Sequence, residues 1–205
     1  MYACTCRYST LVCSLLRGLI FHDTPTLVTH TMNLFLLSRR PRKLAKLHCN
    51  KHVVKMILET TQLLWTAVHC GNKTMPTTVH KPYRKTHVWH PTAMWVRDSP
   101  QNHAFTIKVG LALCKEYTRR YGKVHKCQSH LIELKQLGYY EPLERRPFKS
   151  KCGTFSKKCT PFPCAMPLDC VVERDGKVNP VKSYRKYYKK KAKEWAEKGM
   201  IMKWF

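Results

Sequence analysis

Acidic residues are scarce in this chain. It has 12 Asp and Glu against 38 Lys and Arg among 205 residues, and its formal net charge is +26 at pH 7. The basic residues are spread along the whole length rather than confined to a tail. A surface of this charge attracts polyanions, so we expect double-stranded DNA as the partner, with an acidic membrane or capsid surface as the weaker alternative.

Long apolar runs, glycine and sequence repeats are also lacking. No stretch approaches the ~20 apolar residues of a membrane span, and the best candidate, residues 10–21, is short and contains Arg17. No clear small-residue cleavage site follows it, so we expect neither a membrane partner nor secretion. With only 8 glycines and no low-complexity segment, a chain of this length predicts one folded domain with tails.

Paired cysteines are a third absence. The 11 cysteines are odd in number, and none forms a C-x-x-C pair. A disulfide framework normally shows an even, clustered set, so the pattern favours reduced thiols inside a cell. Cys152, Cys159, Cys164 and Cys170 are neighbours in sequence, but their spacings of five to seven residues are wider than a usual zinc knuckle. A zinc site there is a minor alternative.

The chain is organised around residues 41–71, whose pattern predicts one amphipathic helix. Pro41 suits a first helical turn, and Gly71 suits a left-handed C-terminal cap. Apolar residues recur between them at the three-and-four spacing of a helix with one buried face: Leu44, Leu47, Val54, Ile57, Leu58, Leu64 and Val68.

A polar seam runs through this apolar face. His48, His52, Lys55 and Glu59 follow one another at i, i+4, i+7 and i+11, so a continuous helix stacks them along one line. Glu59 is the only carboxylate in residues 24–97. Burial raises the pKa of a carboxyl group and neighbouring cations lower it, so this lone acid is a candidate for a shifted pKa and a functional role. A solvated charged edge is the simpler interpretation.

Two kinds of chemistry fit the seam. In the first, Glu59 is the catalytic acid–base group with His52 and Lys55 as partners, and the basic surface brings the phosphate backbone to it. In the second, His48, His52 and Glu59 bind a metal ion, completed by one of three further histidines, His87, His90 or His103. The H-x-x-x-H spacing is weakly specific, so we expect no metal and no other cofactor.

Further helices are predicted downstream. Residues 33–37 form a short apolar run that fits a buried strand or a first helical turn. After a basic linker over 72–89, proline-initiated helices are predicted over 91–97 and over 100–121, the second closed by Gly122. Another helix is predicted over residues 123–137, and Gly138 ends it.

The C-terminal third changes character. Residues 139–180 lose periodicity and accumulate prolines, which predicts an extended wrap over the helical body. Residues 182–198 predict a basic helix interleaved with Tyr and Trp. The fold class is therefore all-α, a single compact helical domain over residues 32–205 with a Pro-rich extended wrap and a basic C-terminal helix. Residues 1–31 are expected to be an extension outside the domain, since the sequence from Met32 onward resembles the start of a domain.

Basic and aromatic residues gather in the 72–89 linker and in the C-terminal helix, and such mixtures suit phosphate contact and base stacking. We expect the DNA-binding residues to be Arg84, Lys85, Arg97, Arg185, Lys186, Tyr187, Tyr188 and Lys189.

The run HCNKHVVKMILETTQLL, residues 48–64, resembles a family of small proteins encoded by phages and large DNA viruses, as do downstream positions His90, Pro91, Trp95, Arg97, Ser99 and Asn102. More remotely, the chain is similar to the pyrimidine-dimer DNA glycosylases of the endonuclease V type. Those enzymes have a short apolar run, then a helix with a His and, seven residues later, the catalytic Glu. The corresponding residues are His52 and Glu59. A basic segment rich in Tyr and Trp, residues 184–188 and 203–205, is also similar.

The resemblance implies a compact helical body and base excision. In these glycosylases the free amine of an N-terminal Thr forms a Schiff base with the sugar, and the Glu assists. The corresponding position lies near Thr31 or Met32, which is inside a peptide bond if the chain starts at Met1. A chain that starts at Met32 would use the Met32 amine. Lys55, one turn before Glu59, is the alternative nucleophile if its pKa is depressed.

We therefore expect an intracellular DNA-binding protein, in the host cytoplasm or nucleus or in the virion. Its expected activity is glycosylase and AP lyase chemistry on damaged or modified DNA, with a flipped nucleotide reached from a basic groove. The alternative is a non-enzymatic viral DNA-packaging or virion protein, which the charge supports equally well. The sequence specifies neither the lesion nor the oligomeric state.

Overall fold

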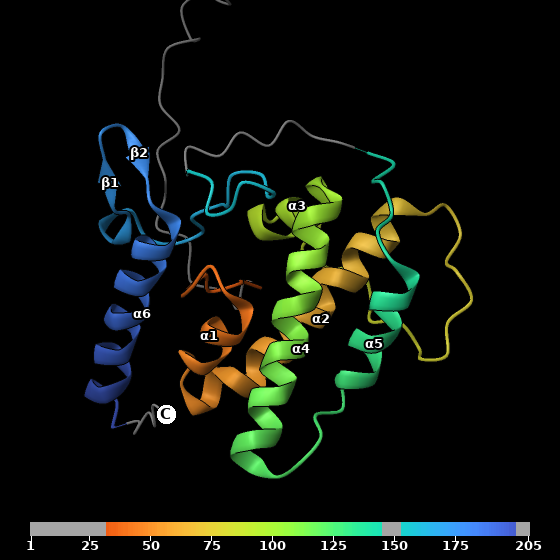
Figure 1. The fold of residues 1–205 in the computed structure, drawn as a ribbon, viewed down its shortest axis with the longest axis horizontal. Coiled ribbons are helices and arrows are strands. Elements are labelled where there is room, and N and C mark those ends of the chain that lie inside the picture. Colours follow the sequence, from red (N-terminus) through yellow and green to blue (C-terminus); the bar gives the residue numbers. More distant parts are fainter. Residues whose placement is uncertain (1–31, 145–152, 200–205) are drawn as a thin grey trace, which may run out of the picture. The chain divides into compact units, whose positions relative to one another are not determined.

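The computed structural model describes residues 32–144 and 153–199. Within them lie six α-helices, one short 3₁₀ helix and one two-stranded antiparallel sheet (Figure 1). The prediction of an all-α domain with an extended wrap and a basic C-terminal helix is confirmed. The elements are α1 (Pro41–Lys46), α2 (Asn50–Gly71), α3 (Pro91–Asp98), α4 (Pro100–Tyr121), α5 (Gln128–Leu137), η1 (Leu168–Cys170), β1 (Glu173–Arg174), β2 (Lys177–Val178) and α6 (Pro180–Glu197).

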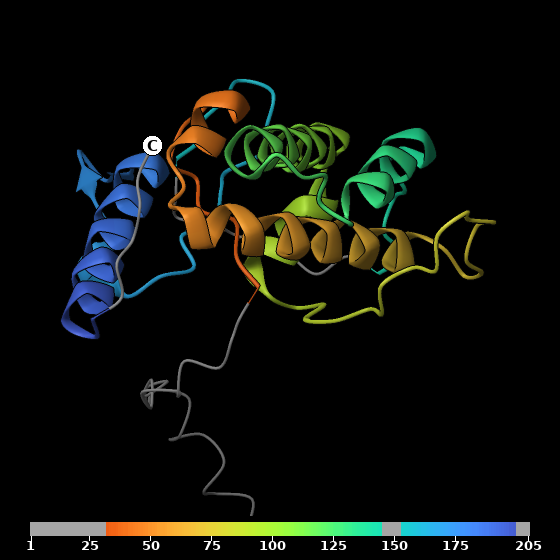
Figure 2. The ribbon, with the colours of Figure 1, turned by 90° about the horizontal axis from the view of Figure 1, so that it is seen from below.

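The core lies between α2 and α4, the two longest helices. Helices α1, α3 and α5 also pack against α4, and Figure 2 shows α2 running along one side of the layer formed by α1, α4 and α5. Gly110 of α4 permits a close approach, because a Cβ there would meet the side chains of Leu131 and Thr60. The apolar stripe of α4 is buried at Phe105, Val109 and Leu113.

The helix predicted over residues 41–71 is in fact two helices. Helix α1 ends at Lys46 and α2 begins at Asn50. The break is stabilised from outside: the Cys49 N–H donates to the Tyr188 hydroxyl at 2.9 Å, and Arg120 Nη1 donates to the His48 carbonyl at 2.8 Å. Both partners are distant in sequence, so the local pattern carried no sign of the break.

Gly71 is also different from its prediction. It is the last residue of α2, and the capping residue Asn72 is extended, with φ −131°. A Cβ at Gly71 would clash with Tyr140. The glycine is therefore required for the approach of residues 140–143, where the Leu143 N–H donates to the Cys70 carbonyl at 2.9 Å, and not for a left-handed cap.

The apolar run at the start of the domain is neither a strand nor a helical turn. Residues 32–38 are buried and belong to no helix or sheet, and the Leu37 N–H donates to the Phe35 carbonyl at 2.9 Å. The Asn33 side chain ties this segment to the wrap and to α6, since its Nδ2 donates to the Ala165 carbonyl at 3.0 Å and its Oδ1 accepts from the Tyr184 hydroxyl at 3.1 Å. The segment is thus part of the core, and polar contacts hold it there.

Two local features of the second half depart from the predictions. The helix expected over 123–137 begins at Gln128, because Gly122 turns the chain with φ +65° and the following residues form a loop. The wrap contains a hairpin, β1–β2, with Asp175 and Gly176 at φ +53° and +69°. Both residues have positive φ, which is the two-residue Asp-Gly turn that suits the twist of a hairpin.

Two further predictions concern a membrane span and the two ends of the chain. Within residues 32–144 and 153–199, no helix combines the length and the apolar character needed to cross a membrane. The proposed extension, residues 1–31, and the aromatic end, residues 203–205, lie outside the described residues.

Candidate functional site

Glu59 is buried in α2, with 7% of its surface exposed. One carboxylate oxygen, Oε2, accepts a hydrogen bond from the backbone N–H of Asn33 at 2.9 Å. The other, Oε1, lies 3.2 Å from the Lys55 ammonium, an i, i+4 ion pair. A buried carboxylate needs such partners, because an unpaired charge in the core is costly. The structure therefore places the lone acid of this region against the first residues of the helical domain.

Lys55 connects this carboxylate to the surface. Its side chain is 46% exposed, while that of Glu59 is 9% exposed. The pair thus has one solvent-facing amine and one enclosed carboxylate. The ion pair stabilises the ammonium form of an amine, so Lys55 can act as a nucleophile only after it passes a proton to Glu59 or to water.

His48 and His52 are also buried, but their surroundings are aromatic. The ring of His52 lies 4.8 Å from Trp195, 5.0 Å from Phe35 and 5.3 Å from Tyr188, measured between ring centroids. His48 Nδ1 is 2.8 Å from the Leu44 carbonyl, which makes Nδ1 the protonated nitrogen. The two rings are 6.5 Å apart.

Burial keeps both imidazoles neutral. It lowers the pKa of His48 to about 4, with the Arg120 charge adding to the effect. It lowers the pKa of His52 to about 3, helped by His48 and by neighbouring lysines. An imidazole with so low a pKa is a weak base at neutral pH. Of the three predicted catalytic residues, Glu59 and Lys55 are brought together, whereas His52 belongs to a ring cluster.

The metal alternatives have no geometric support among the residues that the structure describes. No group of three or more His, Cys, Asp or Glu side chains there is close enough to hold an ion. This covers the set of His48, His52 and Glu59, and three of the four cysteines weighed for zinc. The fourth, Cys152, lies outside the described residues.

The predicted DNA-binding loop is anchored on α5 and α2 and presents its cations to solvent. Glu133 of α5 accepts from the Val79 and His80 backbone N–H groups at 2.5 and 3.2 Å and from His80 Nδ1 at 2.9 Å. Arg84 and Lys85 are exposed. A fixed loop with free basic side chains suits contact with phosphates.

Arg97 has a different environment. It is only 4% exposed, and its guanidinium lies 5.4 Å from the Trp89 ring centroid. Burial lowers its pKa. This position suits a structural cation–π contact at the end of α3.

Helix α6 divides the other predicted residues between two faces. Arg185, Lys186 and Lys189 are exposed, Tyr187 is half-buried, and Tyr188 is 4% exposed. The Tyr188 hydroxyl is engaged with Cys49, so this ring supports the α1–α2 break and does not face solvent. Of the predicted contacts on α6, the three long cations are therefore the ones that face solvent.

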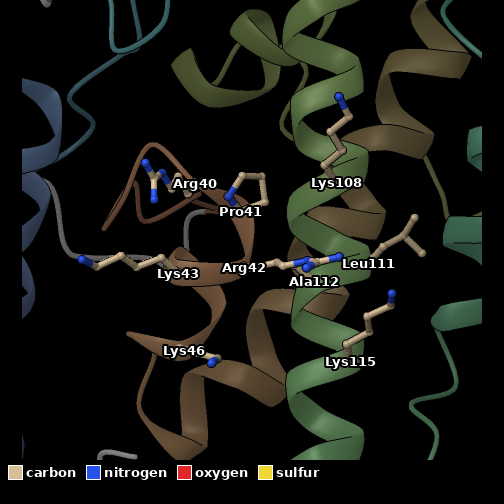
Figure 3. A pocket seen from close by; sticks show the side chains of 9 residues that line it. All are labelled: Arg40, Pro41, Arg42, Lys43, Lys46, Lys108, Leu111, Ala112 and Lys115. Atoms are coloured by element: carbon tan, nitrogen blue, oxygen red, sulfur yellow. The ribbon is translucent and has the colours of Figure 1, made fainter.

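A further basic feature was missed by the sequence analysis. A cavity of about 750 Å³ lies between α1 and α4 (Figure 3). Six cationic side chains line it, from two segments about 65 residues apart in sequence: Arg40, Arg42, Lys43, Lys46, Lys108 and Lys115. The sequence signals were the basic cluster RRPRKLAK at residues 39–46 and two lysines at i, i+7 in α4, but nothing local indicated that they face each other.

Comparisons of the chain with models of known protein families, with curated proteins and with solved structures found no match.

Proposed function

We propose that the protein binds double-stranded DNA and excises a damaged or modified base, with Glu59 as the acid–base group. The observation that carries this proposal is the contact of the buried Glu59 carboxylate with the Asn33 backbone nitrogen at 2.9 Å. In the glycosylases that the sequence resembles, a catalytic Glu assists an amine at the start of the chain. Here the corresponding carboxylate contacts the nitrogen at the start of the helical domain.

Two nitrogens are in place for the amine role. If the chain is opened before Asn33, the Asn33 nitrogen becomes a free α-amine beside Glu59 Oε2. In the uncut chain, the Lys55 ammonium is 3.2 Å from Oε1. In either case the deprotonated amine would bond to C1′ of the sugar while the glycosidic bond breaks, and the base would leave with the bonding electrons and take up a proton from water. Loss of a proton from the bound nitrogen and opening of the C1′–O4′ bond, with a proton added to O4′, would then give the Schiff base. Glu59 would accept the proton that the amine loses.

The test is borohydride trapping of the Schiff base on duplexes that contain an abasic site or a pyrimidine dimer. Chains beginning at Met1, Met32 and Asn33 are compared, each with Glu59→Gln as the matched control. Lys55→Arg keeps the ion pair but removes the primary amine. Peptide mapping of the adduct identifies the nitrogen.

The outcomes separate the two amines. An adduct formed by the chain beginning at Asn33 and not by the chain beginning at Met1 assigns the α-amine. An adduct of the full chain that Lys55→Arg abolishes assigns Lys55. Adducts that persist unchanged in Glu59→Gln would overturn the role proposed for Glu59, and no adduct with any chain would overturn the proposal of an enzyme.

A non-enzymatic DNA-packaging or virion protein is the second candidate function. The observation that favours it is that both Glu59 oxygens are engaged, one with Lys55 and one with Asn33, while none of these three residues is among those that line the basic cavity between α1 and α4. A protein that binds DNA tightly, neutralises many phosphates and acts on no damaged duplex would fit this function.

A further inference from the structure

The cavity between α1 and α4 has the composition of an anion site. Among the residues that the structure describes, its lining consists of six Lys and Arg side chains and three apolar residues, Pro41, Leu111 and Ala112, with no acidic residue. Lys108 and Lys115 are exposed and lie two turns apart on one face of α4, with Leu111 and Ala112 between them. Figure 3 shows Arg42 pointing toward this face of α4. The result is an apolar floor with cations around it.

A second cavity, of about 410 Å³, continues the first. It is lined by Ser38, Arg39, Arg40, Lys43, Val181 and Arg185. Arg40 and Lys43 line both cavities, and Figure 3 shows Lys43 pointing away from α4. The two cavities therefore form one basic track that leads from α4, past α1, to Arg185 of α6.

The nearest acid does not offset this charge. Glu116 follows Lys115 in sequence, but it is 4% exposed, and its carboxylate accepts from Arg119 at 2.6 Å and from Arg120 at 2.7 Å. These hydrogen bonds, with that of Arg119 foremost, lower the Glu116 pKa against the effect of burial. The carboxylate is neutralised on its own helix, so the potential of the track stays positive.

The spread of the cations indicates a polymeric ligand. A single phosphate is usually held by two or three converging groups, whereas these eight cations are distributed over α1, the residues before it, α4 and α6. A phosphodiester backbone presents one negative charge per nucleotide and matches such a row. The apolar floor formed by Leu111, Ala112 and Pro41 suits the sugar edges between phosphates.

We propose that this track, defined by Arg39, Arg40, Arg42, Lys43, Lys46, Lys108, Lys115 and Arg185, binds the phosphodiester backbone of one DNA strand. It adds α1 and α4 to the surface predicted from the sequence, of which Arg185 alone is shared. The binding does not depend on the chemistry proposed for Glu59, so either can fail without the other.

The experiment measures the affinity of the full chain for a fluorescent 20-base-pair duplex as a function of salt. The test variant is Lys108→Ala/Lys115→Ala, and the matched control is Lys126→Ala/Lys135→Ala, which removes two exposed lysines near and on α5. The slope of log K against log salt should fall by about 1.8 in the test variant, since each lost phosphate contact accounts for about 0.9. The control should keep the wild-type slope.

A second variant changes the two residues that line both cavities. Arg40→Gln/Lys43→Gln affects both, so its loss of affinity should exceed that of Arg185→Gln, which affects one. The variants at Arg40, Lys43, Lys108 and Lys115 should melt like the wild type, because these side chains are exposed. Arg185→Gln also removes the hydrogen bond from Arg185 Nε to the Leu37 carbonyl at 2.9 Å, so its affinity is compared at a temperature where its fold is intact. Glu59→Gln should leave the slope unchanged, which separates this site from the proposed active site.

Two results would overturn the proposal. One is a salt slope of the Lys108→Ala/Lys115→Ala protein equal to that of the α5 control. The other is a Lys108→Ala/Lys115→Ala protein that no longer binds phosphatidylserine vesicles but keeps its full DNA affinity, which would assign the track to an acidic membrane surface.

Discussion

The molecule contains two charged regions of opposite character. Around Glu59, the ionisable groups are enclosed: the carboxylate is paired with Lys55, and both histidines are neutral within aromatic rings. Along the track from α4 to α6, the cations are exposed, and no acid within residues 32–144 and 153–199 lines either cavity. The first region is built to hold a few groups in fixed positions, and the second to attract a polyanion. The polar seam and the basic track are therefore separate parts of this protein.

The largest effect is expected from a substitution at Glu59. Glu59→Gln keeps the shape and can still accept from the Asn33 N–H, but it removes the charge. If Glu59 is the acid–base group, the rate of strand cleavage at damaged sites should fall about 10²–10⁴-fold. DNA affinity should hold or rise slightly, since a negative charge is lost. Full retention of cleavage in Glu59→Gln would contradict the role of Glu59, and a wild-type protein that binds DNA but cleaves no damaged duplex would favour the packaging function.

The next effect concerns the buried histidines and stability at low pH. Their pKa values in the folded state, about 4 for His48 and about 3 for His52, lie below the unfolded value of about 6.5. The unfolded chain therefore binds more protons between these limits. The stability present above pH 6.5 should be lost as the pH falls from 6.5 toward 3, by an amount of the order of a few kcal/mol.

This prediction is measured by urea unfolding at pH 7, 5 and 4. His52→Phe replaces the imidazole with a ring of similar size that does not titrate, so its stability should depend less on pH than that of the wild type. His87→Asn is the control, since His87 is exposed and has φ +47°, a conformation that Asn tolerates. Parallel curves for His52→Phe and the wild type would show that the ring cluster does not govern acid unfolding.

A smaller effect tests how the break between α1 and α2 is held. Tyr188→Phe removes the acceptor of the buried Cys49 N–H, and an unsatisfied buried donor costs about 1–3 kcal/mol. Tyr121→Phe removes a hydroxyl that donates to the Asn50 carbonyl at the surface, and should change stability by less than about 0.5 kcal/mol. Equal losses in thermal unfolding would contradict the role assigned to Tyr188.

The smallest effect is expected from the exposed lysines of α6. Deletion of residues 182–205 would remove the buried Tyr184 and Tyr188, so it would test folding as well as binding. Lys186→Ala/Lys189→Ala removes exposed charge alone. If α6 tracks phosphates as the sequence predicted, the salt slope for duplex binding should fall by about 1.8. An unchanged slope would confine the DNA surface to the α4–α1–α6 track and the 72–89 loop.

The all-α class and several helix ends could be predicted because their signals are local. Ser99 caps α4 through a hydrogen bond to the Asn102 N–H, Gly122 ends it in a left-handed conformation, and Gly138 follows α5. These signals act within a few residues of the backbone groups that they satisfy. The Asp-Gly turn of the β1–β2 hairpin was equally local, but its strands have two residues each and left no alternating pattern to detect.

The sequence by itself determined the helical periodicity, the excess of positive charge and the solitary position of Glu59 among basic residues. Only the tertiary structure decided the ends of α1 and α2, the contact of Glu59 with Asn33, the enclosure of His52 and the meeting of α1 with Lys108 and Lys115. The physical reason is distance along the chain. The Tyr188 contact that holds the break spans 139 residues and the Arg120 contact spans 72, so these energies depend on how the helices pack and are absent from any local pattern.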